Sequence, residues 1–343
     1  MSKEPDKIIL PAEWHKQCAV MLTWPHEATD WRYILDDVTN CYVDVAHEIV
    51  KHEKLIVVCK DEKKLRKLLA DIEESILFRE IDTNDTWARD HGPITVFVDG
   101  EPFVYDFQFN GWGLKFASNL DNQITRKLYD SDVFSSNVGY FSLLNYVLEG
   151  GSIESDGKGT LMTTSECLTS VNRNEGLSKN EIEAFLKEVF GLKRVLWIHS
   201  GSLAGDDTDS HVDTLARFCD EQTIAYMQCT DKKDEHYDAL KEMEDEIKQF
   251  RTLDGKPYRL IPLPMPTAQY EGEERLPATY ANFLIINEVV LMPTYHCGED
   301  EIALKQLKTA FPNREIIGVD CRMLIRQHGS LHCITMQLPE GLI

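Results

Sequence analysis

The sequence predicts an α/β or α+β protein, and three observations lead to this class. Segments with helical periodicity alternate with short apolar runs that have the length of strands. Turn signals such as Asp99-Gly100 join neighbouring apolar runs into hairpins. A unit of hairpin, helix and strand recurs about five times. We therefore expect residues 1–343 to form a single domain built from about five such units.

Clear local signals mark several elements in the first half of the chain. Ser178 and Glu181 form a capping box, which opens a helix that Gly191 ends. We expect strands at 18–24, 54–59 and 195–198, helices at 31–51, 61–72 and 178–191, and hairpins that pair 93–98 with 102–107 and 145–149 with 160–163. The side chains expected to face inward from the helix at 61–72 are Leu65, Leu68, Leu69 and Ile72.

The second half of the chain repeats this order of elements. A Pro- and Glu-rich segment at 262–277 is too long for a simple connection, which is typical of a functional lid. If the units form a ring, the last strand, at 331–338, must pair with the N-terminal unit and carry Cys333 into the middle of the molecule. The remaining expected elements are hairpins of 211–218 with 223–228 and of 280–286 with 289–292, helices at 232–250 and 300–311, and strands at 258–261 and 315–319.

The charge of the chain limits its partners. The formal net charge is −22 and the sequence pI is about 4.9. We expect no nucleic-acid partner, because no basic stripe is present to neutralise phosphates. An anionic membrane surface is disfavoured for the same reason. An acidic protein attracts cations, so a small cationic substrate fits, although acidity also serves solubility alone.

The cysteines and the N-terminus favour a cytoplasmic protein. The nine cysteines are scattered and form no Cys-x-x-Cys pair, so neither a zinc cluster nor a disulfide framework is indicated. Many scattered cysteines without a disulfide pattern are typical of proteins in a reducing cytosol. Residues 1–7 are polar and lack the apolar segment of a signal peptide, and no apolar run is long enough to span a bilayer.

Cys333 is the first candidate for chemistry. It stands near the start of an apolar run that follows the Gly329-Ser330 turn. A thiol there lies at the mouth of a strand, where the backbone is fixed and the side chain can still be reached. Taken alone, a free cysteine is more often a small buried hydrophobe. Its interpretation therefore depends on polar residues elsewhere in the chain.

His211 and Asp213 form the second candidate group. They are two residues apart in a strand-like run, so a period of two places them on one face together with Arg217. Polar side chains between apolar neighbours are costly to bury without partners. The pair is consistent with a structural hydrogen bond or with catalysis. A metal site lacks a third or fourth ligand at suitable spacing.

Three carboxylates and two tryptophans complete the set. Asp90 precedes Gly92-Pro93 and has a turn cap as its structural alternative. Glu149 ends an apolar strand, and Asp207 belongs to an acidic cluster that is otherwise read as a solvated turn or a calcium loop. Trp87 and Trp112 lie beside glycine or charged residues, which favours the wall of a pocket over a core position.

Together these residues favour covalent chemistry on a cation. A cysteine paired with a histidine indicates nucleophilic catalysis. Surrounding carboxylates would oppose the oxyanion that a protease must stabilise. They suit a guanidinium, which is planar, always charged, and offers paired N–H donors that carboxylates match two at a time.

Five motifs, in their order along the chain, resemble those of the agmatine deiminase and bacterial-type peptidylarginine deiminase family. The resemblance runs from about residue 14 to residue 337. It implies the pentein fold, a five-bladed and pseudo-symmetric ββαβ propeller with the active site in its central channel. The motifs are Trp87–Pro93, Phe109–Gly113, Leu148–Gly151, Gly205–Asp213 and Gly329–Cys333.

The resemblance also implies a role for each catalytic candidate. Cys333 would attack the guanidinium carbon and form an amidino-cysteine. His211 would protonate the departing ammonia and then activate water. Asp90 and Asp213 would bind the guanidinium nitrogens, and Glu149 would orient His211. In a family member the products from agmatine are N-carbamoylputrescine and ammonia, and no metal or organic cofactor takes part.

The same resemblance places the substrate. Trp87, with Trp112 as a second aromatic candidate, would wall the pocket, and Asp207 would bind the far amine of agmatine. Relatives are often dimers, so a homodimer is one expected assembly. The chain departs from the family pattern at Gly329-Ser330-Leu331 and at Ser210. Both departures change loop shape, so they affect substrate choice more than chemistry.

Several alternatives remain at this point. The substrate could be peptidylarginine or free arginine in place of agmatine. An amidino-transferring or dimethylarginine-hydrolysing relative would share the covalent intermediate. A non-catalytic guanidine- or polyamine-binding relative would bind without turnover, and a metal-dependent hydrolase would lose activity in chelator. The absence of an export signal and of extra domains favours agmatine or another small guanidine.

Overall fold

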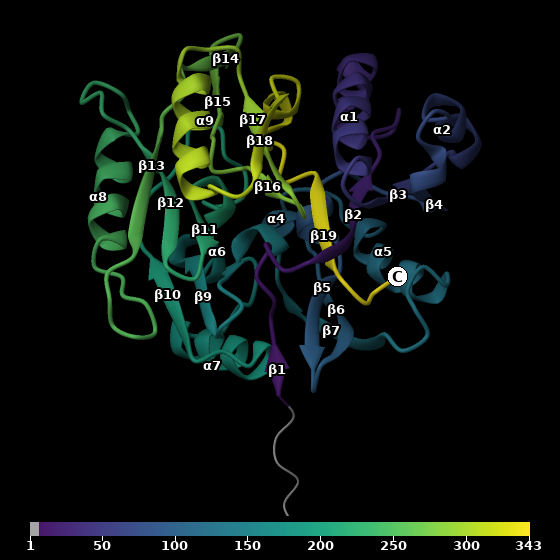
Figure 1. Ribbon diagram of the computed structural model, residues 1–343, viewed down its shortest axis with the longest axis horizontal. Coiled ribbons are helices and arrows are strands. Elements are labelled where there is room, and N and C mark those ends of the chain that lie inside the picture. The colour runs from purple at the N-terminus through teal and green to yellow at the C-terminus, as the bar shows by residue number, and fades with distance from the viewer. Residues whose placement is uncertain (1–6) are drawn as a thin grey trace, which may run out of the picture.

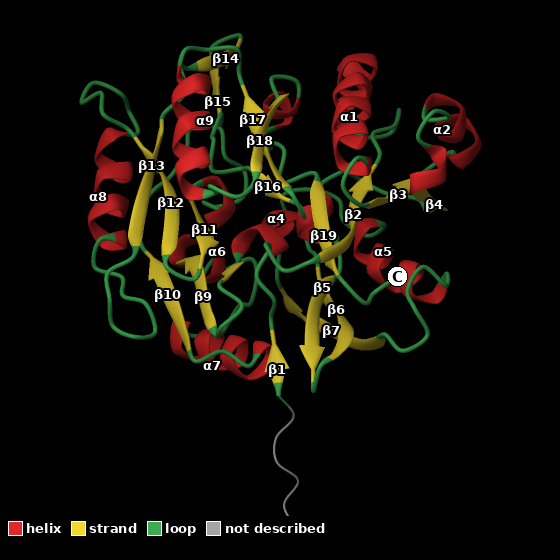
Figure 2. Cartoon of the chain, in the orientation of Figure 1, coloured by secondary structure: helices red, strands yellow, loops and turns green. Residues whose placement is uncertain are grey.

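The computed structural model describes residues 7–343 and has a mixed α/β fold (Figures 1 and 2). Within these residues the strands form six sheets, and five of them repeat one pattern. In each of the five, two strands pair antiparallel and a third strand pairs parallel with the second. A helix lies in the chain between the second and third strands, because a parallel connection needs a crossover. The propeller arrangement itself stays a prediction.

The five sheets account for most of the chain. The first holds β19 (Thr335–Pro339), β2 (Gln17–Thr23), β3 (Lys54–Cys59) and β4 (Ile76–Glu80), with α1 (Leu35–Val50) and α2 (Glu62–Leu68). The second holds β1 (Ile8–Ile9), β5 (Ile94–Val98), β6 (Glu101–Gln108) and β7 (Gly139–Val147), with α5 (Ile124–Asp130). The third holds β8 (Glu154–Ser155), β9 (Thr160–Thr164) and β10 (Arg194–Ile198), with α6 (Ser165–Leu168) and α7 (Lys179–Phe190). The fourth holds β11 (Ala216–Asp220), β12 (Thr223–Gln228) and β13 (Arg259–Pro264), with α8 (Tyr237–Ile247). The fifth holds β16 (Leu284–Ile285), β17 (Val289–Thr294) and β18 (Glu315–Asp320), with α9 (Glu299–Ala310).

The C-terminal strand joins the first sheet, beside a strand of the N-terminal unit. Strand β19 pairs antiparallel with β2, in a register that sets Thr335 opposite Leu22 (Figure 1). The predicted pairing of the C-terminal strand with the N-terminal unit is therefore confirmed. The strand begins two residues after Cys333, so this cysteine lies in the loop that enters β19. Its side chain is 5% exposed.

Several predicted elements are confirmed at their turns and caps. Strands β5 and β6 form the hairpin over Asp99 and Gly100, whose φ angles are 51° and 91°, as a tight turn requires. Helix α7 begins at the Ser178 capping box and ends at Gly191, which has a φ of 65°. Of residues 7–343, no helix combines the length and the apolar character that crossing a membrane requires.

The predicted hairpin of 145–149 with 160–163 is wrong. Residues up to Val147 belong to β7, which pairs parallel with β6. The partner of β9 is the short strand β8, which Asp156 and Gly157 connect to it. A turn at Gly150–Ser152 separates the two sheets, and Glu149 lies at this boundary. An apolar run at the edge of two sheets does not reveal to which of them it belongs.

Two other predictions need correction. The helix at 61–72 is shorter than expected, because α2 ends at Leu68, whose side chain is 46% exposed and does not face inward. The segment 262–277 is not a plain loop, since it contains the hairpin of β14 (Gln269–Glu271) and β15 (Glu274–Leu276). Whether this segment acts as a lid stays a prediction.

Candidate active site

Three predicted site residues converge on Gly151. A Cβ atom at this glycine would lie 2.6 Å from His211 Nδ1, 2.8 Å from Asp90 Oδ1 and 3.2 Å from Asp213 Oδ2. Asp90 lies in the segment before β5, whereas His211 and Asp213 lie in one segment before β11, and only a residue without a side chain leaves room for all three. The close approach of these three side chains explains why a glycine stands at position 151 of the Glu149-Gly150-Gly151 motif.

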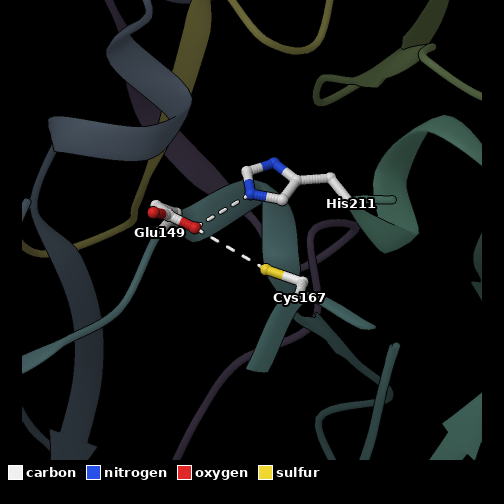
Figure 3. Close-up of side chains that lie close together, drawn as sticks. All are labelled: Glu149, Cys167 and His211. Carbon is white, nitrogen blue, oxygen red and sulfur yellow. Dashed lines mark hydrogen bonds and ion pairs between the residues drawn. The ribbon is translucent and has the colours of Figure 1, made fainter. Parts of the chain in front are cut away.

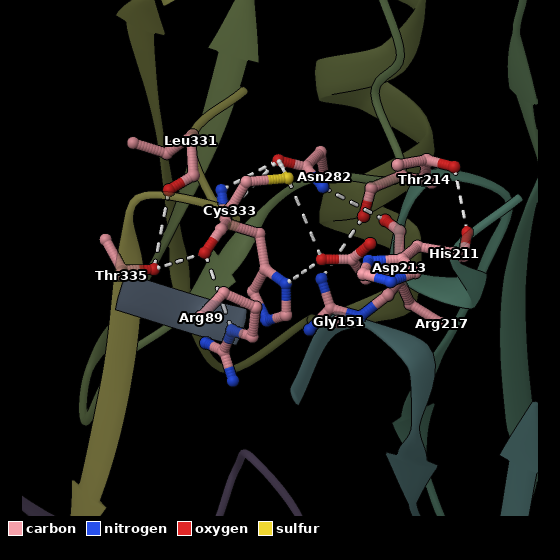
Figure 4. A network of polar contacts seen from close by, with 12 residues as sticks. Arg89, Gly151, His211, Asp213, Thr214, Arg217, Asn282, Leu331, Cys333 and Thr335 are labelled. Carbon is pink, nitrogen blue, oxygen red and sulfur yellow. Dashed lines mark hydrogen bonds and ion pairs between the residues drawn. The ribbon is translucent and has the colours of Figure 1, made fainter. Parts of the chain in front are cut away.

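Cys333 lies beside this group (Figure 4). Its Sγ atom is 3.4 Å from Asn282 Oδ1 and 4.0 Å from Asp213 Oδ2. The same Asn282 oxygen accepts the backbone N–H groups of His332 and Cys333 at 2.9 and 3.2 Å, which fixes the backbone at the nucleophile. Burial, and then the charges of Asp213 and Asp90, raise the pKa of the Cys333 thiol well above its ordinary value. The thiol is therefore protonated while no cation is present.

Cys333 lines a cavity of ≈ 120 Å³. Trp87 and Trp112 are walls of this cavity, as predicted, and both are at most 6% exposed. Gly329 packs flat against Trp87, since a Cβ there would lie 2.2 Å from the indole ring. The carboxylates that line the cavity are those of Asp30, Asp85, Asp90 and Asp207. Among its described lining residues none is lysine or arginine.

His211 is held through one ring nitrogen only. Its Nε2 atom lies 3.0 Å from Glu149 Oε2, whereas Nδ1 lies 3.6 Å from Asp90 Oδ1 and makes no hydrogen bond to any described residue. Burial disfavours the imidazolium, but the charge of Asp90 and the contacts with Cys167 and Glu149 outweigh it. The pKa of His211 therefore lies well above its ordinary value. The protonated Nδ1 faces Asp90 as a free donor.

Glu149 is itself anchored by an arginine. Arg173 Nε lies 2.8 and 3.1 Å from the two carboxylate oxygens, and both side chains are fully buried. Burial raises the pKa of Glu149, but the bond from His211 and the charge of Arg173 more than offset this and lower it. Figure 3 shows Glu149 beside both His211 and Cys167, whose Sγ lies 3.7 Å from Glu149 Oε2.

Two buried groups have ligand atoms close enough to hold a metal ion. They are Glu149, Cys167 and His211, and Glu13, Glu154 and His332. In each group a guanidinium already binds a carboxylate, from Arg173 in the first and from Arg217 in the second. The carboxylate charge that would balance a metal ion is therefore already neutralised by an arginine. These two donor sets fit a metal poorly for this reason.

Asp90 and Asp213 differ in how many of their carboxylate oxygens accept a hydrogen bond. Asp90 Oδ2 accepts from Trp112 Nε1 at 2.9 Å and Oδ1 accepts from the Gly151 N–H at 3.0 Å. Burial raises the pKa of Asp90 to about 6. Asp213 Oδ2 accepts from His332 Nδ1 at 2.7 Å, whereas Oδ1 has no partner among the described residues. Burial would raise the pKa of Asp213, but the hydrogen bond from His332 lowers it.

Asp207 also lines this cavity. Its side chain is 44% exposed and lies 4.0 Å from His328 Nδ1. Burial of the remainder raises the pKa of Asp207. At another lining residue, burial and the charge of Asp121 raise the pKa of Asp85 to about 7.

The local structure around His211 differs from the prediction. Asp209 and Ser210 have φ angles of 61° and 63°, and a short 3-10 turn at Val212–Thr214 follows them. Strand β11 begins only at Ala216, so His211 and Asp213 are not strand neighbours and do not share a face with Arg217 through a period of two. They converge because this strained turn is held by Asp206, whose Oδ2 accepts the Ser210 N–H at 2.7 Å.

The sequence interpretation missed five polar residues at the site. All five are buried, four of them contact a predicted site residue, and Glu13 contacts His332. Only His332 belongs to one of the sequence motifs. Asn282 could be found only by its nearness to Cys333, and His332 was read as part of the cysteine motif. The five residues are Glu13, Cys167, Arg173, Asn282 and His332.

A buried thiol lines a cavity rich in carboxylates, and the buried imidazole of His211 lies against one of them, Asp90. On a mixed α/β fold this arrangement is that of a guanidine-modifying hydrolase. The chain belongs to the family described as Porphyromonas-type peptidyl-arginine deiminase, whose model matches residues 9–339.

Three similar proteins match nearly the whole chain. A crystal structure described as a putative arginine deiminase from Porphyromonas gingivalis is 54% identical, with a TM-score of 0.95 over 98% of this chain and 100% of that one. A substrate-bound variant of C. jejuni agmatine deiminase is 39% identical, with a TM-score of 0.93 over 100% of this chain and 99% of that one. A Mycoplasma capricolum protein named "putative agmatine deiminase" is 33% identical over 97% of this chain and 96% of its own.

Proposed function

We propose that the protein hydrolyses agmatine to N-carbamoylputrescine and ammonia through an amidino-cysteine at Cys333. One observation carries this proposal: a thiol opens into a cavity whose described lining has four carboxylates and neither lysine nor arginine. Such a lining attracts a cation and would repel an anionic electrophile. The substrate-bound C. jejuni agmatine deiminase supports it, because in that relative a cysteine is replaced by serine.

Binding of the guanidinium satisfies atoms that are now without partners. A buried acceptor without a hydrogen bond costs roughly 1–3 kcal/mol. Asp213 Oδ1 is such an atom, and it can accept from a guanidinium nitrogen. Asp90, whose pKa is about 6, binds the opposite side and becomes fully ionised when the cation arrives. The same positive charge lowers the pKa of Cys333, so the thiol proton leaves for solvent as the cation enters.

The first half-reaction forms a C–S bond and breaks a C–N bond. The Cys333 thiolate attacks the guanidinium carbon and gives a neutral tetrahedral adduct. His211 Nδ1 then donates its proton to one nitrogen of this adduct, because Nε2 is engaged by Glu149. Ammonia departs, and a positively charged amidino-cysteine and a neutral His211 remain.

The second half-reaction restores the thiolate. Neutral His211 removes a proton from water, and the hydroxide adds to the amidino carbon. The C–S bond then breaks, the Cys333 thiolate leaves, and loss of the O–H proton gives the ureido group. The released ammonia takes up this proton as ammonium, so the sum is one guanidinium and one water converted to one urea and one ammonium.

The cavity favours agmatine over free arginine. The two molecules differ by the α-carboxylate of arginine, which would approach Asp30, Asp85 and Asp207. Like charges brought together at the mouth of a cavity cost binding energy, whereas the amine of agmatine meets these carboxylates with the opposite sign. Peptidylarginine is a second candidate because the family description carries that name.

The test compares agmatine, free arginine and a peptide with an internal arginine as substrates of the purified protein. Mass spectrometry detects the ureido product and a coupled assay detects ammonia. We expect turnover of agmatine with the highest kcat/KM, and none with Cys333→Ala. A matched control is Cys229→Ser, which changes a buried cysteine that does not line the cavity. A higher kcat/KM for either arginine substrate would contradict the choice of agmatine.

A further inference from the structure

His332, the residue before the nucleophile, joins two buried carboxylates. Its Nδ1 atom lies 2.7 Å from Asp213 Oδ2 and its Nε2 atom lies 2.6 Å from Glu13 Oε2. The side chain is 1% exposed. The contact therefore links the N-terminal segment, the cysteine loop and the turn at Asp213, which are far apart in the chain.

Both nitrogens of His332 face carboxylate oxygens in this arrangement. An ionised carboxylate only accepts hydrogen bonds. Burial opposes ionisation of Glu13, but the charges of Arg217 and His332 hold the pKa of Glu13 far below its ordinary value, and the pKa of Asp213 is lowered as well. Glu13 is also fixed by Arg217 Nη2 at 2.6 Å and by the Ile285 N–H at 2.7 Å, so its oxygens cannot turn away. The imidazole is thus held at both ends, with each ring nitrogen within hydrogen-bond distance of a fixed carboxylate.

This bridge restricts the orientation of the Asp213 carboxylate. A carboxylate that is free to rotate about its last bond presents either oxygen in several directions. At Asp213 the bond from His332 engages Oδ2, the oxygen that also lies 4.0 Å from Cys333 Sγ. Oδ1 is left without a partner among the described residues, at a side chain that is fully buried.

We propose that His332 is a positioning residue, which anchors Oδ2 of Asp213 so that Oδ1 is presented to the planar cation in front of Cys333. Glu13 holds the other end of His332 and thereby sets its ring plane. The inference rests on the proposed function, because it assumes that a guanidinium or amidinium group is the ligand of Asp213. Neither residue touches the reacting atoms in this account.

Two isosteric substitutions separate the two ends of the bridge. In His332→Asn the amide nitrogen stands close to the position of Nδ1 and keeps the hydrogen bond to Asp213. In His332→Gln the longer side chain places its nitrogen near the position of Nε2 and keeps only the bond to Glu13. Both substitutions replace the imidazole by a neutral amide, so a difference between them reports geometry at Asp213.

The readout is the reactivity of the Cys333 thiol and not turnover. Chloroacetamidine is a planar cation with an electrophilic carbon, and chloroacetamide is its neutral counterpart. The ratio of their alkylation rates at Cys333 measures recognition of the cation. We expect His332→Asn to keep most of the wild-type ratio and His332→Gln to lose roughly 10- to 100-fold, as for a lost hydrogen bond to a charged group. Equal ratios in the two variants, or a greater loss in His332→Asn, would overturn the proposal.

A merely structural role would lower thermal stability without changing this ratio, so the thermal midpoint of each variant is measured alongside. If either variant fails to fold, nitrogen-15 spectra of histidine in the wild-type protein give the answer. One imidazole that persists in His211→Ala should have both ring nitrogens in hydrogen bonds, and a ring with one free nitrogen there would contradict the inference. If the wild-type protein prefers the amidine but does not hydrolyse agmatine, the proposed function fails and this inference stands.

Discussion

Glu149 Oε2 lies 3.0 Å from Nε2 of His211, while Nδ1 of the same ring has no hydrogen-bond partner among the described residues. In the proposed mechanism, one nitrogen therefore orients the ring and the other is left for proton transfer. The division assigns the catalytic proton to Nδ1, which faces Asp90 at 3.6 Å. It also explains why a fully buried carboxylate and its arginine stand behind the imidazole.

Glu149→Gln should reduce kcat by roughly 10²- to 10⁴-fold, the range of a lost general acid and base. The hydrogen bond that His211 donates to Glu149 helps to raise the pKa of His211, so its removal lowers that pKa. His211 must be protonated to release ammonia, and the alkaline limb of the rate profile should therefore move to lower pH. The control is Glu244→Gln, a buried glutamate that does not line the cavity. An unchanged alkaline limb would remove Glu149 from this role.

Gly151→Ala should abolish turnover while the protein stays folded. The added Cβ would lie within 2.6 Å of His211 Nδ1 and 2.8 Å of Asp90 Oδ1, so one of the two side chains must move. Gly298→Ala is the matched control, because a Cβ at Gly298 meets nothing within 4 Å. Circular dichroism monitors folding, and the ammonia assay monitors activity. Turnover near the wild-type rate in Gly151→Ala would show that these side chains need not converge there.

Below pH 6 kcat/KM should fall, because Asp90 must be ionised to bind the cation and its pKa is about 6. As the pH falls through this pKa, the Asp90 carboxylate binds a proton and loses its charge. Its attraction for the guanidinium is then lost, so kcat/KM decreases. The hydrogen bond from Trp112 lowers this pKa. Trp112→Phe should therefore move the acidic limb to higher pH. Trp197→Phe, outside the cavity, should leave the limb in place.

Asp207→Asn should weaken selection for the amine of the substrate. Since this carboxylate is 44% exposed, solvent screens it, and a change of roughly two- to fivefold in KM for agmatine is expected. Butylguanidine, which lacks the amine, should show no such change. The two KM values are measured side by side in wild-type and variant protein. An equal effect on both substrates would place the amine elsewhere.

The sequence predicted the parts of the fold that local signals specify. The Asp99-Gly100 hairpin, the helix between Ser178 and Gly191, and the closing strand are confirmed, because turn residues, caps and apolar runs act over a few positions. The pairing of residues 145–149 could not be predicted, since it depends on which neighbouring sheet offers a free edge.

The sequence motifs predicted which residues lie together near Cys333, but they did not predict the buried residues that support them. Cys333, His211, Asp90, Asp213 and Glu149 lie together, although the turn at Asp209 and Ser210, and not a strand, brings His211 into place. Arg173 and Asn282 carry no motif, and the folded chain alone brings them to Glu149 and Cys333. Their contacts depend on tertiary structure that no local pattern encodes.

The central claim is a covalent bond between Cys333 and the guanidinium carbon. It is tested by mixing the protein with agmatine, quenching with acid during turnover, and mapping the peptides by mass spectrometry. The account predicts the mass of the amidino adduct on the peptide that contains Cys333, and none on the peptide that contains Cys167. Rapid turnover of agmatine by Cys333→Ala, or an adduct on Cys167 alone, would contradict it.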